Sequence, residues 1–90
     1  MKTGELTHAM DLRVGDEILQ HGGAFRVRAI IKAVGSPERG IAPCHANICD
    51  YLGLAEGYDK CHIPVHWRTD WNAQGNERMR VYVLKRAEVS

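Results

Sequence analysis

Residues 17–34 read EILQHGGAFRVRAIIKAV, two segments rich in apolar residues that are separated by a pair of glycines. Glycine adopts positive φ angles without strain, so Gly22-Gly23 predicts the two-residue turn of a β-hairpin. After the glycines, apolar residues occupy alternate positions, as in a strand with one buried face: Phe25, Val27, Ala29 and Ile31. The stretch therefore predicts a hairpin of residues 17–20 with residues 24–34, whose basic residues face solvent.

The segments on either side of this hairpin are short and are separated by glycine and proline. Thr7 is predicted to cap a single helical turn over His8–Leu12, because the sequence Val14-Gly15-Asp16 follows at once and reads as a tight turn. Downstream, residues 35–43 and 53–64 are rich in turn-forming residues and are interpreted as loops. A short strand over about residues 46–54 is expected between them.

The last third of the chain predicts a closing hairpin. Four residues of one parity, expected to share a strand face, are Val65, Trp67, Thr69 and Trp71. The sequence Gln74-Gly75-Asn76 then favours a turn, which places a hairpin at Trp71–Arg78. Short strands with one helical turn indicate an all-β fold, namely a small antiparallel barrel of about five strands.

Composition limits the class of protein. The chain has 90 residues, of which 44% are hydrophobic and 26% charged, and its formal net charge is +1. This size fits one domain over residues 1–90 and excludes a two-domain enzyme. Three cysteines do not form a complete disulfide framework, and residues 1–19 contain no apolar run typical of a signal peptide or a membrane span. We therefore expect a cytoplasmic protein with reduced thiols.

Three motifs together resemble small phage and prophage proteins to which no activity is assigned. The motifs are LRVGDEI at residues 12–18, GGAFRV at residues 22–27 and WNAQGN at residues 71–76. The resemblance covers both ends of the chain but not residues 35–64. It implies a five-stranded barrel of the Src-homology type and an origin in a mobile element. Because small phage proteins often occupy a host protein, it also implies a macromolecular partner in the host.

The middle of the chain contains residues with the chemistry of zinc ligands. Thiolates and imidazoles can complete a tetrahedral site, and the candidate ligands are Cys44, Cys49, Cys61, His62 and His66. Such a metal would tie two loops together in a domain with a thin core. The alternative is that Cys49 is an ordinary small core residue and that the histidines are loop residues.

Catalysis is the less favoured alternative. A cysteine-dependent hydrolase needs a thiolate, an imidazole and an orienting group, which Cys44 or Cys61, His62 or His66, and Asp50 or Asp59 nominally supply. Such triplets arise by chance in a chain with three cysteines and five histidines. No nucleophile elbow, Walker loop or zinc-protease helix accompanies them. We expect a protein that is not an enzyme and needs no cofactor, with zinc as the alternative.

Two sets of residues are candidates for binding a macromolecule. Basic and aromatic side chains that could hold phosphates and stack bases are Arg26, Arg28, Lys32, Arg78, Arg80 and Tyr82. The tryptophans Trp67 and Trp71 are ordinarily core residues, but one exposed indole would be typical of a protein-binding hot spot. We expect a non-enzymatic binding module for a host protein or nucleic acid, with a zinc-stabilised nucleic-acid-binding domain as the alternative.

Overall fold

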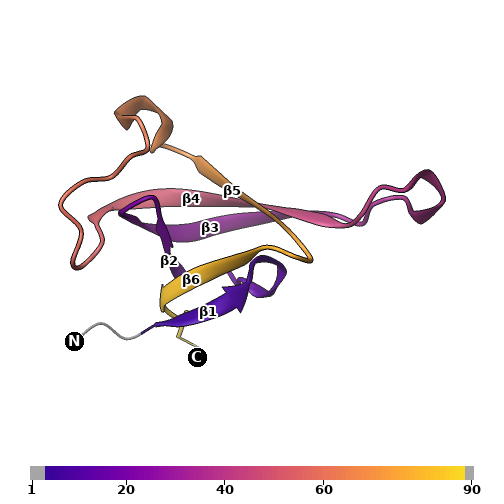
Figure 1. The fold of residues 1–90 in the computed structure, drawn as a ribbon, viewed down its shortest axis with the longest axis horizontal. Helices are drawn as coiled ribbons and strands as arrows, with labels where there is room; N and C mark the ends of the chain where they lie inside the picture. The colour runs from indigo at the N-terminus through magenta and orange to yellow at the C-terminus, as the bar shows by residue number, and fades with distance from the viewer. Residues whose placement is uncertain (1–3, 89–90) are drawn as a thin grey trace.

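The computed structural model describes residues 4–88, which form a single antiparallel sheet of six strands in the order β1-β6-β2-β3-β4-β5 (Figure 1). The strands are β1 (Glu5–His8), β2 (Glu17–Gln20), β3 (Gly23–Ala33), β4 (Cys44–Leu54), β5 (Trp71–Asn76) and β6 (Arg80–Lys85). Short 3-10 turns are η1 (Ala9–Asp11), η2 (Pro37–Arg39) and η3 (Val65–Trp67). The predicted all-β class is confirmed.

The N-terminal segment accounts for the sixth strand, where about five were expected. Thr7 does not cap a helical turn, because it lies in β1 opposite Val81 of β6. The turn η1 begins one residue after His8, which occupies the N-cap position without a side-chain hydrogen bond. Pairing with β6 thus holds the first residues of the chain in extended form, and the predicted turn is reduced to three residues.

The predicted β2–β3 hairpin is confirmed, with its turn one residue earlier than expected. His21 and Gly22 have positive φ angles of 51° and 91°, and Gly23 already belongs to β3. A Cβ on Gly22 would lie 2.1 Å from the carbonyl oxygen of Lys60, so the turn requires glycine for space as well as for backbone conformation. The glycine pair therefore forms the hairpin turn and also allows the loop that contains Lys60 to pass close to it.

The β3–β4 hairpin is the longest feature of the fold and contains a β-bulge (Figure 1). Val27 pairs with Cys49 and Ala29 with Ile48, so Arg28 is an extra residue without an opposite number. A bulge of this kind reverses the side on which the following residues point. Ala29 and Ile31 were expected to be buried, and this prediction is wrong because both lie beyond the bulge, where Ile31 is 63% exposed.

The predicted closing hairpin at Trp71–Arg78 is also wrong. Gln74-Gly75-Asn76 is the end of β5, which pairs with β4, whereas β6 pairs with β1 and β2. Gly75 is needed for another reason, because a Cβ there would lie 2.2 Å from the Cβ of Ala9 in η1. The close contact of η1 with β5 brings the two ends of the bent sheet together.

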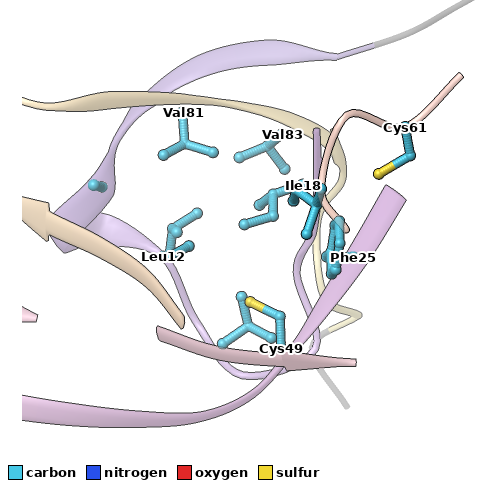
Figure 2. Close-up of a cluster of buried hydrophobic side chains, with 11 residues drawn as sticks. Leu12, Ile18, Phe25, Cys49, Cys61, Val81 and Val83 are labelled. Atoms are coloured by element: carbon cyan, nitrogen blue, oxygen red, sulfur yellow. The ribbon is translucent and has the colours of Figure 1, made fainter. Parts of the chain in front are cut away.

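The core fills the space between the two halves of this sheet. In Figure 2, Val81 and Val83 of β6 face Cys49 of β4, with Leu12, Ile18 and Phe25 between them. Ile18, Phe25 and Cys49 have no exposed surface. Burial of these apolar side chains is the main contribution to the stability of the fold. Each of the larger ones contributes roughly 1.5–3 kcal/mol.

The Val14-Gly15-Asp16 motif has a structural role, which depends on the carboxylate of Asp16. This carboxylate is fully buried and accepts hydrogen bonds from the backbone N–H of Arg13 at 2.9 Å and of Ala87 at 2.7 Å. The Arg86 guanidinium lies 3.5 Å from the same carboxylate. The motif therefore joins the segment before β2 to the segment after β6, and its role is structural.

Candidate binding surface

The cysteines of β4 lie on opposite faces of the sheet. Cys49 faces the core, and its Sγ lies 3.3 Å from the backbone oxygen of Asn47. Burial raises the pKa of the Cys49 thiol to about 11, which keeps it protonated and unreactive at neutral pH. Cys44 is separated from Cys49 by an odd number of positions in a regular strand, so its side chain points away from the core. A single ion cannot bind both thiols without a rearrangement of β4.

Two further candidate ligands, Cys61 and His62, lie near the far end of β4 from Cys44, whereas His66 lies in η3, beside the pocket that Asp50 and Tyr51 line. The backbone N–H of His62 donates to the carbonyl oxygen of His21 in the β2–β3 turn. This turn lies beside the Leu54 end of β4, because Gly23 pairs with Leu54. Cys44 is ten residues from Leu54 along β4, or roughly 30 Å at the usual rise of a strand. A candidate hydrolase group of Cys44 with His62 is separated by a similar distance, and Asp50 lies six residues from Cys44 along β4, or roughly 20 Å.

Cys61 is buried, whereas His62 and His66 are exposed. Over residues 4–88, no group of three or more His, Cys, Asp or Glu side chains is placed to hold a metal ion. The fold thus does not bring the predicted zinc ligands together, and the zinc site stays a prediction that this geometry does not favour.

Two of the candidate basic residues are paired with carboxylates on the outer face of the sheet. Arg26 lies 3.4 Å from Glu17. Arg28 contacts Asp50 at 3.2 Å and also donates to Asp70. The hydrogen bond to Asp70 is the main cause that raises the pKa of the Arg28 guanidinium. Their positive charge is therefore largely balanced within the protein.

The other candidate basic residues do not join this face. Lys32 lies beyond the bulge and pairs with His45, on the side opposite to Arg26. Arg80 and Tyr82 belong to β6, which β2 separates from β3, and Arg78 lies in the turn after β5. The candidate residues are thus dispersed over the molecule and form no continuous basic surface.

The two tryptophans occupy different environments, so the prediction that they share one strand face is wrong. Trp71 in β5 packs against Phe25 with ring centroids 6.2 Å apart, and its indole N–H donates to Gln20 Oε1 at 3.3 Å. Trp67 lies in η3 and is 57% exposed. The reason is Pro64, which cannot donate to a strand ladder and precedes a turn instead.

The turn that contains Trp67 borders an open pocket of about 430 Å³, lined by Asp50, Tyr51, Val65, Arg68 and Thr69. Arg68 fixes this region, because its guanidinium donates to the carbonyl oxygens of Ile63 at 2.8 Å and Cys61 at 3.2 Å. The same guanidinium lies over the Tyr51 ring, 4.9 Å from its centroid. Val65 is 73% exposed at the edge of the pocket.

We call this region the η3 patch and define it as Tyr51, Val65, Trp67, Arg68 and Thr69. The sequence singled out Trp67 but not Tyr51 or Arg68, since their contact depends on how the loop after β4 folds back over the strand. The only sequence signal for the turn is the proline before Val65.

Comparison with known proteins gives no relative. No model of a protein family matches the chain, and neither a curated protein nor a solved structure is found to be similar. Within the described residues, 4–88, no helix is long and apolar enough to cross a membrane.

Proposed function

We propose that the chain is a non-enzymatic binding module and that the η3 patch docks onto a protein partner. The observation that carries the proposal is Trp67, which is 57% exposed on a turn held by backbone hydrogen bonds. Tryptophan, tyrosine and arginine are the residues most enriched at the energetic centres of protein interfaces. The η3 patch contains all three, with Tyr51 and Arg68 lining the pocket and Trp67 on the turn beside it, which favours protein recognition.

The rigidity of the η3 patch supports this role. The backbone N–H of Trp67 donates to the carbonyl oxygen of Pro64 at 2.9 Å. The Arg68 guanidinium is held by its hydrogen bond to Ile63 and by its contact with the Tyr51 ring. A side chain that is already ordered loses little conformational entropy when a partner binds. The patch is therefore suited to bind without a costly rearrangement.

Charge favours a protein over a nucleic acid as the partner. The arginines closest to the η3 patch on the sheet, Arg26 and Arg28, are paired with carboxylates, and the formal net charge is only +1. Binding to phosphates depends on free cationic groups that release counterions. A contact surface centred on an aromatic residue, with balanced charges beside it, instead resembles the core and rim of a protein interface.

The proposal is tested by affinity capture from a lysate of the source cells, with and without nuclease, followed by titration of the captured protein. We expect Trp67→Ala to weaken binding by about 30-fold or more, as for a hot-spot residue. The control variant is Val34→Ala, which removes a residue that is 85% exposed outside the patch, and it should bind normally. Capture that is lost with nuclease, or binding unaffected by Trp67→Ala, would contradict the proposal.

A further inference from the structure

Strand β5 is an edge of the sheet whose own sequence carries none of the usual protection against pairing, and η1 contacts it on the buried face, at Gly75. It lies at the end of the strand order, and its pairing with β4 runs without a register shift from Cys49↔Trp71 to Cys44↔Asn76 (Figure 1). Its sequence, WNAQGN, contains no charged residue and no proline. Natural edge strands normally carry such residues, or a bulge, because an open row of backbone groups can pair with another chain.

The other edge of the sheet is different. Strand β1 has only four residues, and its Glu5 forms an ion pair with Arg86 at 3.6 Å. A short and charged edge strand is poorly suited to pair with a further strand. The contrast within one sheet singles out β5 as the edge open to pairing.

The sheet face beside β5 is also uncharged. The register places one set of residues from β3, β4 and β5 on this outer face, namely Ala29, Ile31, Ala33, Cys44, Ala46, Ile48, Asn72, Gln74 and Asn76. None of these residues is charged, although 26% of the whole chain is. The charges at the end of this face nearest Trp71 are those of Asp50 and Asp70, and both carboxylates are paired with Arg28. A second molecule can therefore approach this edge from the same side without meeting a like charge.

We propose that β5 pairs with β5 of a second copy of this chain, antiparallel and about a two-fold axis at Gln74. This proposal is independent of the η3 patch. In a two-fold interface the same surface meets itself, so it must be self-complementary. In this register Gln74 lies opposite Gln74, and Asn72 lies opposite Asn76 of the second copy.

The side chains of β5 supply this self-complementarity. Asn72, Gln74 and Asn76 each carry an amide that can donate and accept hydrogen bonds. Asn76 Oδ1 already accepts one from the backbone N–H of Arg78 at 2.9 Å, which leaves the Asn76 NH2 group to donate to a second copy. The two-fold axis at Gln74 is the register in which every one of these amides meets another amide. It places no two carboxylates opposite each other, because Glu77 faces Trp71 and Asp70 faces Arg78 of the second copy at the ends of the paired segment. Of the strands that could pair with this edge, β5 of a second copy is the one whose side chains are seen to match, because its amides face the same amides.

The interface is small, and we therefore expect a concentration-dependent dimer. In this register residues 72–76 of each copy pair, and five residues of backbone pairing bury less surface than the about 1,600 Å² of a standard stable interface. The mass of the wild-type protein, measured by sedimentation over a wide range of concentrations, should rise from monomer to dimer. A protein that stays monomeric throughout this range, at concentrations up to the millimolar, would overturn the proposal.

A charge swap at the two-fold axis tests the register. Gln74 is exposed, so Gln74→Lys and Gln74→Glu should both fold. Each variant alone places like charges directly opposite and should remain monomeric, whereas a mixture of the two should dimerise again. Dimers of Gln74→Lys alone would overturn the proposal, as would a mixture that stays monomeric. Dimers that are insensitive to both substitutions but lost in Ile31→Asp would indicate packing between faces instead.

Disulfide crosslinking provides a second readout with a matched control. Both variants are made in a Cys44→Ser background, because Cys44 is partly exposed on the same face. Opposite residues in antiparallel strands have Cα atoms about 4.5–5.5 Å apart, within the range of a disulfide, so Gln74→Cys should form a covalent dimer on oxidation. Asn72→Cys should not, since its two copies would be separated by roughly 14 Å. Equal crosslinking of the two variants would contradict the register.

Discussion

The two halves of the β3–β4 hairpin differ in packing and in charge, and the bulge at Arg28 separates them. Before the bulge, Phe25 and Val27 are buried on the inner face, while Arg26 pairs with Glu17 on the outer face. Beyond it, β3 contributes no buried side chain, and the outer face is uncharged. One half thus builds the core, and the other forms an arm that extends away from it (Figure 1).

This difference teaches that the core uses only the inner face of the arm, for example through Ile30 and Ala73, and that the outer face of the arm is free of that role. The charges of the first half are balanced in pairs that involve Arg26 and Arg28, so they form part of the protein's own surface. The two surfaces that we propose for partners are the η3 patch, at the core half, and the edge of β5, along the arm.

The largest expected effect compares one residue from each half. Phe25→Ala should reduce the free energy of unfolding by about 3–5 kcal/mol, because it leaves a cavity in the core. Ile31→Ala should change the same quantity by less than about 0.5 kcal/mol, since Ile31 is exposed on the arm. Urea unfolding of both variants measures the difference. Equal losses would show that the arm packs against something that the structure lacks.

The next effect concerns the point at which the arm contacts η1. Gly75→Ala should reduce the free energy of unfolding by about 1–3 kcal/mol, because its Cβ would overlap Ala9. The neighbouring Gln74→Ala removes an exposed side chain and should be nearly neutral. Thermal unfolding of the two variants tests the contact, and an equally stable Gly75→Ala would refute the closure of the sheet by η1.

The buried thiol of Cys49 makes the stability of the protein depend on pH. Cys49 is buried, with its pKa raised to about 11, so the unfolded chain loses this proton at lower pH than the folded chain does. The free energy of unfolding should therefore fall from about pH 9 to pH 11, by at most about 2 kcal/mol. Denaturant midpoints at several pH values measure it, and Cys49→Ala should lack this component. Equal dependence in both proteins would place the cause elsewhere.

The smallest effect concerns the paired charges of the first half. Asp50→Asn combined with Asp70→Asn releases Arg28 from both carboxylates and raises the formal net charge by two. We expect weak, salt-sensitive binding of a single-stranded oligonucleotide by the double variant and less by the wild type. Fluorescence anisotropy at low salt measures both. Tight binding by the wild type would contradict the assignment of the η3 patch to a protein partner.

The sequence predicted the first hairpin because its signals are local. A glycine pair between two apolar segments is sufficient to mark the β2–β3 turn. The bulge at Arg28 could not be predicted in this way, since it depends on the register with β4. Gly75 was mistaken for a turn residue, because nothing in the local sequence shows that Ala9 approaches it.

For the candidate site, too, the local features were predicted from the sequence and those that depend on the tertiary fold were not. Trp67 was among the predicted binding residues, but its separation from Trp71 depends on η3, which the strand-like alternation of residues 65–71 concealed. The cysteines and histidines looked like a cluster because they are close in sequence. They are dispersed because β4 is eleven residues long and carries Cys44 far from the loop that contains Cys61 and His62.

The most direct test of the central claim, that the free protein presents Trp67 to a protein partner, is the fluorescence of the Trp71→Phe variant. Its single indole should emit as in water and be accessible to acrylamide, and addition of the captured partner should shift the emission to the blue and shield it from the quencher. The Trp67→Phe variant, which reports on Trp71, should remain unchanged. A Trp67 indole that is already shielded in the free protein, or unaffected by the bound partner, would contradict the account.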